Sequence, residues 1–228
     1  MNLYQRLLKE TTTERDYLMA SPIINRCFQG DIEVDDYLAF LHEAYHHVKH
    51  TVPLLMATGA HLPESKEWLR EAVAEYIEEE IGHQEWILND IAVCNVDKNE
   101  ARSSTPSFAT ELMIAYAYDI INRVNPLGFF GMVHVLEGTS IAIADKAAEK
   151  IQQVLTLPNE AFSYLRSHGS LDLEHVKFFE DLMSKISDKE EQDLIINSAK
   201  KFFKLYGDIF RTLNLSEPKL HISQPIEA

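Results

Sequence analysis

The chain has 228 residues, of which 46% are hydrophobic and 25% are charged. This composition is typical of a globular protein with a sizeable core, and it excludes the low hydrophobicity of disordered chains. The formal net charge of −15 argues against nucleic acids and anionic membranes as partners, because both attract basic surfaces.

The two cysteines, Cys27 and Cys94, stand far apart and lack the spacing of a metal-binding pair. A disulfide framework is therefore not expected. The first residues include acidic side chains and no continuous apolar run of the kind found in signal peptides. No apolar run approaches the ~20 residues needed to cross a bilayer, so we expect a cytoplasmic protein.

Apolar residues recur at helical intervals almost throughout, and the alternation typical of strands is nearly absent. Gly30 closes a first helical region. Helices are predicted over about 34–58 and about 64–93, and the stretch from Gly59 to Pro63 separates them.

The C-terminal part of the chain carries a clear helix start. A capping box from Ser187 to Glu190 predicts a last helix over about 188–213. Residues 214–228 contain two prolines and predict a loose tail. Together the segments predict an all-α bundle of seven or eight antiparallel helices, in a single domain that spans residues 1–213.

The first candidate site lies in the acidic stretch EYIEEEIGHQEW. Residues three or four apart share one face of a helix, so Glu80 and His83 can point at the same atom, as can Glu79 and His83. A carboxylate and an imidazole would then converge. The alternative is a solvated acidic face with a surface histidine, because Glu-x-x-His arises by chance in glutamate-rich helices.

The second candidate is the stretch SHGSLDLEH. Asp172 and His175 repeat the three-residue spacing, and His168 stands one helical turn before Asp172. An aspartate that caps a helix, beside two exposed histidines, is the alternative. Because glycine weakens a helix interior by ~1 kcal/mol, we expect a break or raised mobility near Gly169 without metal.

The third candidate is Glu137, inside a mostly apolar run from Phe129 to Ile143. A glutamate buried there must be neutralised, paired or bound to a cation. His134 lies one turn earlier, where a buried histidine without a ligand role is the favoured interpretation.

Taken together, six side chains are candidate metal ligands, and they are Glu80, His83, Glu137, His168, Asp172 and His175. Acid and histidine pairs on separate helices, with a lone glutamate between them, are how helical bundles hold two iron or manganese ions. Carboxylates neutralise the dications and imidazoles suit iron. A set of unrelated polar residues is the alternative.

A further polar cluster, FLHEAYHHVKHTVPLL, contains His42, Glu43, His46, His47 and His50. The last four of these residues occupy adjacent turns, so one or two of them could line the same cavity. The apolar stripe through Tyr45, Val48 and Val52 directs the others to solvent, so the cluster is interpreted mainly as a helix surface. Glu43 is kept as an outside candidate for a ligand. Whether Glu43, Glu79 or His134 joins the site is left open.

The order of these motifs resembles the heme-oxygenase-like dimetal oxidases and oxygenases, whose superfamily also contains thiaminase II and pyrroloquinoline-quinone synthase proteins. The resemblance covers about residues 15–212 and rests on Glu80-x-x-His83, Glu137 within VLEGTS, and His168-x-x-x-Asp172-x-x-His175. It implies a heme-oxygenase-like bundle that binds iron, activates dioxygen and oxidises a small organic molecule. Known types act on fatty acids, amino acids and N-hydroxylated groups.

Two departures from that superfamily limit the choice of activity. Heme oxygenases place their heme ligand near the N-terminus, whereas this chain has no histidine before His42. Thiaminase II uses a central cysteine nucleophile, and neither Cys27 nor Cys94 is suitably placed. Heme degradation and thiamin hydrolysis are therefore not expected.

The sequence thus predicts a metal-dependent oxidoreductase, a non-heme and dinuclear iron enzyme that uses dioxygen on a small-molecule substrate such as a fatty acid or amino acid. Manganese is an alternative metal. A metal-free protein on the same fold, either a small-ligand binding protein or a cofactorless oxidase, is the second hypothesis, and ferritin-like metal storage is a third. The amount of apolar surface favours a homodimer.

Overall fold

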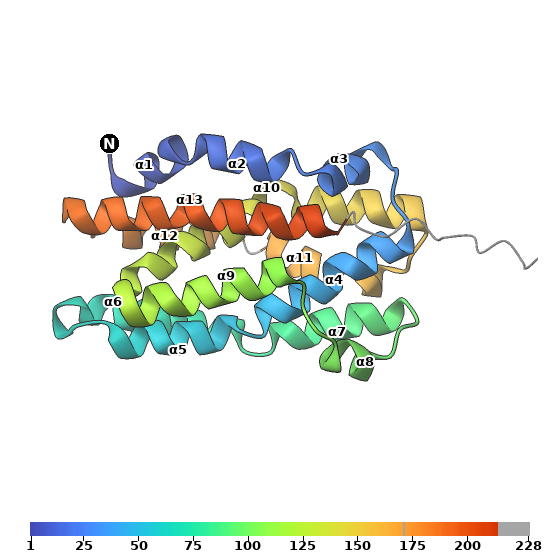
Figure 1. The fold of residues 1–228 in the computed structure, drawn as a ribbon, viewed down its shortest axis with the longest axis horizontal. Coiled ribbons are helices and arrows are strands. Elements are labelled where there is room, and N and C mark those ends of the chain that lie inside the picture. The colour runs from blue at the N-terminus through green and yellow to red at the C-terminus, as the bar shows by residue number, and fades with distance from the viewer. Residues whose placement is uncertain (171, 214–228) are drawn as a thin grey trace, which may run out of the picture.

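The computed structural model describes residues 1–170 and 172–213, and the side chains of residues 168–175 lie outside that description. Within these ranges the chain forms helices and no strand. Most helices run along one long axis, with α1 to α3 on one edge, α13 and α10 in the middle, and α5 to α7 on the opposite edge (Figure 1).

The α-helices are, in chain order, α1 (Leu3–Glu10), α2 (Thr12–Met19), α3 (Pro22–Gln29), α4 (Val34–Val48), α5 (Thr51–His61), α6 (Glu67–Glu80), α7 (His83–Val93), α8 (Lys98–Ser103), α9 (Phe108–Asp119), α10 (Phe129–Leu155), α11 (Ser163–Ser170), α12 (Asp172–Ser184) and α13 (Lys189–Thr212). The shorter turns are η1 (Glu64–Lys66), η2 (Ile120–Val124), η3 (Pro126–Gly128) and η4 (Asn159–Phe162). The all-α prediction is confirmed.

The described part of the chain contains more helices than the seven or eight predicted, because long predicted helices are divided. The helix expected over about 34–58 is divided into α4 and α5 near Lys49. The helix expected over about 64–93 is divided into α6 and α7 at Gly82, where φ is 95°. A left-handed glycine ends a helix readily, since it has no Cβ to clash.

The start of α13 lies close to its predicted position. The carboxylate of Asp188 accepts hydrogen bonds from the backbone N–H groups of Glu190, at 2.8 Å, and Glu191, at 3.0 Å. The helix cap is therefore Asp188 rather than Ser187, and α13 begins at Lys189. A carboxylate here also interacts favourably with the positive end of the helix dipole.

The two longest helices, α10 and α13, pack together at the core of the bundle. A Cβ added at Gly131 would lie 2.6 Å from the backbone nitrogen of Ala199 and 2.9 Å from the carbonyl oxygen of Ile195. Only glycine permits this approach. The hydroxyl of Ser198 donates a 2.6 Å hydrogen bond to the carbonyl of Gly128 and fixes the crossing.

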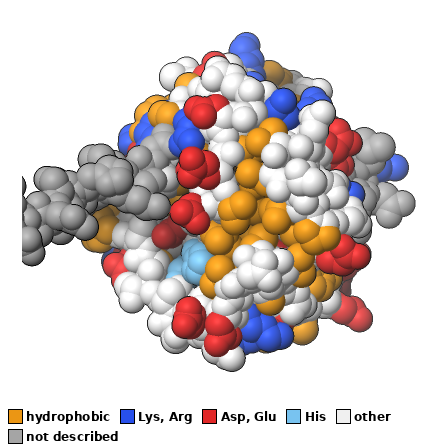
Figure 2. All heavy atoms as spheres, turned by 90° about the vertical axis from the view of Figure 1, so that its right-hand side faces the viewer, with side chains coloured by type: hydrophobic (Ala, Val, Ile, Leu, Met, Phe, Trp, Pro, Cys, Tyr) orange, Lys and Arg blue, Asp and Glu red, His pale blue; other side chains and the backbone are white. Residues whose placement is uncertain are grey.

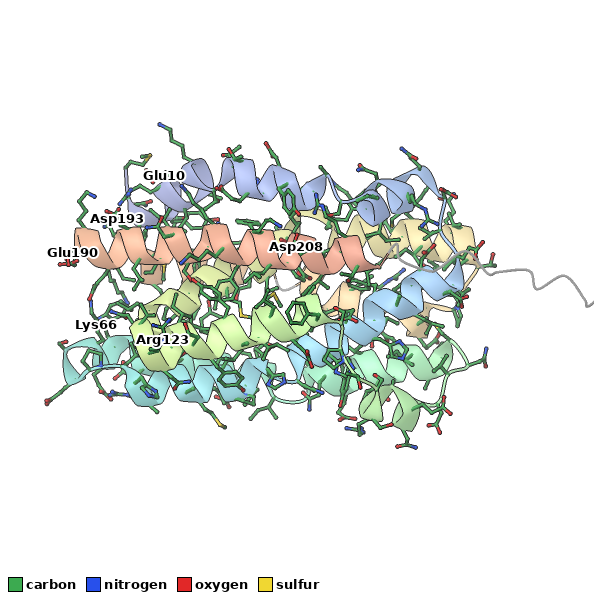
Figure 3. All side chains as sticks on the ribbon, in the orientation of Figure 1. Glu10, Lys66, Arg123, Glu190, Asp193 and Asp208 are labelled. Atoms are coloured by element: carbon green, nitrogen blue, oxygen red, sulfur yellow. The ribbon has the colours of Figure 1, made fainter. Side chains whose placement is uncertain are left out.

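Ion pairs fasten one end of the bundle, where Glu10, Lys66 and Asp193 gather (Figure 3). The guanidinium of Arg6 contacts Glu10 at 2.8 Å and Asp193 at 2.7 Å, which joins α1 to α13. The ammonium of Lys66 lies 2.5 Å from Glu191 and joins η1 to α13. These contacts hold the start of α13 in place on two sides.

One helical stretch, Pro126–Leu155, is long and apolar enough by composition to cross a membrane. In this structure 61% of its most apolar window is buried inside the protein. Because the core helix of a globular bundle has the same composition, this stretch is weak evidence for a membrane span.

Candidate metal centre

The acid and histidine pair of the first motif is formed across a helix break rather than on one helix. Glu80 is the last residue of α6 and His83 is the first of α7. The Nδ1 atom of His83 still lies 3.1 Å from Oε2 of Glu80, because the left-handed Gly82 turns the chain back at that point. The prediction of a shared helix face is wrong, while the convergence of the two side chains is confirmed.

His83 is held by its surroundings as well as by Glu80. Its side chain is only 6% exposed, and its ring stacks on Trp86 with centroids 4.0 Å apart. The side chain of Glu80 is 20% exposed. A carboxylate beside a buried imidazole is found in many metal sites, where the carboxylate orients the imidazole or binds the ion itself.

A cavity of about 70 Å³ lies beside this pair, between α4, α6, α10 and α13. The carboxylates of Glu80 and Glu137 both line it, together with the imidazole of His47. Glu137 is half-buried rather than fully buried as the apolar run predicted. Its position on the cavity wall explains this difference.

The cavity also contains phenol groups. Burial, then the negative charge of Glu137, raises the pKa of Tyr76 far above its ordinary value of 10.0, and Glu79 and Glu80 add to the effect. Burial likewise raises the pKa of Tyr164. Both phenols are therefore protonated at neutral pH.

The donor set of the cavity fits a hard or borderline cation. Two carboxylates and an imidazole line it, and no lysine or arginine does so among the residues that the structure describes. The same described residues contain no group of three histidine, cysteine or acidic side chains close enough to hold an ion. An ion in this cavity would therefore need further side chains as ligands.

Three of the predicted ligands, His168, Asp172 and His175, have side chains outside the described residues. Their backbones belong to the end of α11 and the start of α12, and both helices pack against α10. The predicted break near Gly169 also stays a prediction, because Leu171, which separates the two helices, is not described.

His134 lies outside the cavity. Its ring stacks on Phe179 at a centroid distance of 6.0 Å and meets Tyr4 and Phe203 edge-on at 6.3 and 5.9 Å. Burial lowers its pKa to about 4, with a smaller effect from the charge of Arg15. This aromatic surrounding supports the interpretation of His134 as a neutral core residue.

Glu43 has a structural role. Its carboxylate accepts hydrogen bonds from the backbone N–H and the hydroxyl of Ser107, both at 3.0 Å, and from the hydroxyl of Thr110. These groups form the first turn of α9. Glu43 therefore caps a neighbouring helix, and an anion is favourable there because of the helix dipole.

A second pocket, of about 80 Å³, adjoins the carboxylate cavity and shares Ser140, Tyr164 and Tyr206 with it. Its walls are largely apolar and come from α3, α4, α10 and α13. Figure 2 shows the end of the bundle where α3 and the end of α10 lie, with hydrophobic side chains gathered across the middle of this face. Asp36 also lines the pocket, and it is ion-paired to Arg26 at 2.9 Å.

Sequence reasoning left open which side chains of α4 line the cavity, and the structure places His47 there. His47 is 3% exposed, and its ring meets Tyr206 edge-on at 5.6 Å. His47 follows Phe40 and Ala44 at helical spacing. These three residues therefore share one face of the helix, and the apolar residues on that face indicate an inward position for His47. The phenols at the cavity carried no such signal, since buried tyrosines are common in helical cores.

Comparisons with known proteins agree with this architecture. Residues 38–207 match the family described as iron-containing redox enzyme. No curated protein matches the chain in sequence. A heme-oxygenase-like domain of unknown function from Shewanella denitrificans is 24% identical, with a TM-score of 0.82 over 93% of this chain and 92% of that one.

Two further solved structures share the fold at lower identity. A TenA homologue from Pseudomonas syringae pv. tomato is 9% identical, with a TM-score of 0.77 over 92% of each chain. A heme oxygenase from Leptospira interrogans is 16% identical, with a TM-score of 0.73 over 93% of this chain and 100% of that one. The protein has a heme-oxygenase-like fold and belongs to the iron-containing redox enzyme family.

Proposed function

We propose that the protein is a non-heme iron oxidase or oxygenase that holds two iron ions and uses dioxygen to oxidise a small organic substrate. The observation that carries the proposal is the meeting of Glu80 with His83 at 3.1 Å, at the edge of a cavity that Glu80 and Glu137 both line. Two carboxylates from different helices, with an imidazole beside them, are ligands that iron prefers.

The described residues have distinct roles in this proposal. Glu80 of α6 and Glu137 of α10 supply carboxylate oxygens to the cavity, and His83 supplies an imidazole nitrogen beside Glu80. The protonated phenol of Tyr76 lines the same cavity as Glu137. Iron, when bound, supplies redox chemistry with dioxygen that no side chain can perform.

The ligand set is completed by His168, Asp172 and His175, at the end of α11 and the start of α12. The alternation of acidic and histidine residues at three- and four-residue spacing supports this part of the proposal. Because α11 and α12 both pack against α10, which carries Glu137, these residues share a neighbouring helix with the cavity.

The adjoining pocket indicates the kind of substrate. Its largely apolar walls exclude water from an aliphatic or aromatic group, and the shared residues Ser140, Tyr164 and Tyr206 connect it to the carboxylate cavity. A substrate with an apolar body can thus reach the proposed iron with one end. Fatty acids and amino acids with large apolar side chains are the first compounds to test.

The test is anaerobic reconstitution with Fe(II), followed by measurement of iron per chain and of oxygen uptake with each candidate substrate. We expect up to two irons per chain in the unaltered protein and a marked loss in His83→Ala and in His175→Ala. Less than one iron per chain, or iron binding that neither substitution changes, contradicts the proposal.

The second candidate is a metal-free binding protein or cofactorless oxidase. The observation that favours it is that the described residues contain no group of three metal-ligating side chains in contact. In that case Glu80 pairs with His83 and water, and small-molecule binding persists after chelation. Equal ligand binding before and after treatment with a chelator favours this candidate over the iron enzyme.

A further inference from the structure

A groove on the surface, between α2, α9 and α13, is separate from the carboxylate cavity and shares no lining residue with it. Its volume is about 510 Å³. Leu112 and Tyr116 of α9 and Leu205 of α13 form its apolar floor. These helices face the viewer in Figure 1.

Three lysines, Lys200, Lys201 and Lys204, line the α13 side of the groove. The ammonium of Lys204 is neutralised by Asp208, labelled in Figure 3, at 2.6 Å. Lys201 lies 5.4 Å above the ring of Tyr116. Neither Lys200 nor Lys201 forms an ion pair within 4.0 Å among the described residues, although Glu14 lies on the α2 side.

This local positive charge stands out on a chain whose formal net charge is −15. Adjacent ammonium groups repel one another, and a negatively charged partner relieves that repulsion. An acidic partner is also steered to such a patch from a distance. The charge of the groove therefore selects for an acidic occupant, while its floor selects for an apolar ridge on that occupant.

Exposed apolar side chains extend the floor along α9. Leu112 is 44% exposed, and Phe108, four residues earlier on the same side of the helix, is 76% exposed. A contiguous exposed strip of this kind, bordered by charges, is typical of a protein interaction site.

Aromatic rings connect the groove with the carboxylate cavity. Tyr116, on the floor, contacts the buried ring of Phe202 with centroids 4.9 Å apart. Phe202 precedes Tyr206 by one helical turn on α13, and Tyr206 lines the cavity. One ring contact and one turn of α13 thus separate the surface groove from the proposed iron site.

We propose that this groove docks a small acidic electron-carrier protein, which supplies electrons to the site. The inference rests on the proposed function, because an iron oxidase must return ferric ions to the ferrous state. In each encounter the carrier loses one electron, and one ferric ion gains it. Redox partners usually bury less than about 1,200 Å² in total, so a short apolar floor bordered by charges is the kind of surface they use.

The probe for the test is an acidic plant-type [2Fe–2S] ferredoxin. Its dissociation constant is measured by titration calorimetry at low and high salt, and its oxidation by the ferric protein is followed in its visible absorption band. The charge-reversed variant carries Lys200→Glu and Lys201→Glu. The matched control carries Lys98→Glu and Lys146→Glu, which change the net charge equally at exposed positions outside the groove.

We expect the groove variant to bind ferredoxin at least about tenfold more weakly and to oxidise it correspondingly more slowly, while the control stays close to the unaltered protein. High salt should weaken the unaltered complex. Iron content and reduction by dithionite, measured in every sample, report on the proposed function separately. If the unaltered protein holds no iron after reconstitution, the proposed function is overturned. The binding titration tests the docking site in either case.

Three results overturn the inference. The first is equal binding by the groove and control variants, and the second is binding of a basic carrier, cytochrome c, as tight as that of ferredoxin. The third is a change of oligomeric state in the groove variant, measured by analytical ultracentrifugation. That change would assign the groove to a second copy of this chain instead.

Discussion

Helix α10 carries two titratable side chains, His134 and Glu137, whose surroundings differ sharply. His134 packs against Phe179 and other aromatic rings and remains neutral, while Glu137, three residues later, lines a cavity with Glu80. The same helix therefore directs one polar residue into an apolar core and another into a cavity lined by carboxylates and an imidazole. Burial alone does not distinguish the two residues, whereas the carboxylate that lies beside Glu137 in the cavity does.

Replacing Glu137 should give the largest difference between these two positions of α10. Glu137→Ala removes a carboxylate from the cavity wall, so we expect iron affinity to fall more than about 100-fold, which exceeds the usual cost of losing an outer partner. The His134→Phe variant should keep its iron, because His134 lies outside the cavity. Anaerobic titration with Fe(II) measures both, and equal losses would contradict the contrast.

The pH dependence of stability should be the next largest effect. Burial lowers the pKa of His134 to about 4 from 6.5, so folding favours the neutral ring. The resulting stability is complete above about pH 6.5 and is lost as the pH falls toward 4, by on the order of 3 kcal/mol.

Urea unfolding at pH 7 and pH 4.5 checks this expectation. The unaltered protein should lose more stability on acidification than His134→Phe does. His46, whose pKa is also lowered to about 4 by burial, contributes equally in both proteins. An identical pH dependence in the two proteins would show that His134 titrates normally.

The packing of α10 on α13 positions both regions, and Gly131 allows it. We expect Gly131→Ala to destabilise the protein by about 2 kcal/mol, because the added methyl group meets the backbone of α13. Gly138→Ala, on the same helix, meets no atom within 4 Å and should be neutral or stabilising by up to about 1 kcal/mol. The midpoints of urea unfolding measure the stability of both variants. A similar loss of stability in both would contradict the close approach of α10 to α13.

The smallest effect concerns the turn that brings Glu80 to His83. Gly82 has a φ of 95°, so Gly82→Ala should cost about 1 kcal/mol of folding stability, although the added methyl group meets no neighbour. Gly82→Asn should cost less, since asparagine tolerates left-handed backbone. Thermal unfolding of the two variants measures the difference, and an unchanged Gly82→Ala protein would rule out strain at this turn.

The helical class of the fold was predictable because apolar residues recur at helical spacing along almost the whole chain. The helix ends were harder to predict. Gly82 lies within an uninterrupted helical pattern, and the sequence offers no proline beside it to mark the break. The carboxylate of Asp188, in contrast, caps α13 close to the predicted start.

The candidate site was partly predictable for a similar reason. Local spacing identified Glu80 and His83, and the apolar surroundings of Glu137 identified a carboxylate with a special role. The sequence did not decide which residue of the histidine cluster on α4 faces inward, because the position of His47 depends on how α4 packs against α13, which is a contact between distant segments. The ligand roles of all six predicted residues stay predictions.

Anomalous diffraction at the iron edge, from crystals grown anaerobically with Fe(II), tests the central claim most directly. We expect two anomalous peaks in the cavity between Glu80 and Glu137, with Asp172 and His175 close to them. An empty cavity, or iron bound only at the surface, would contradict the assignment of this cavity as the iron site.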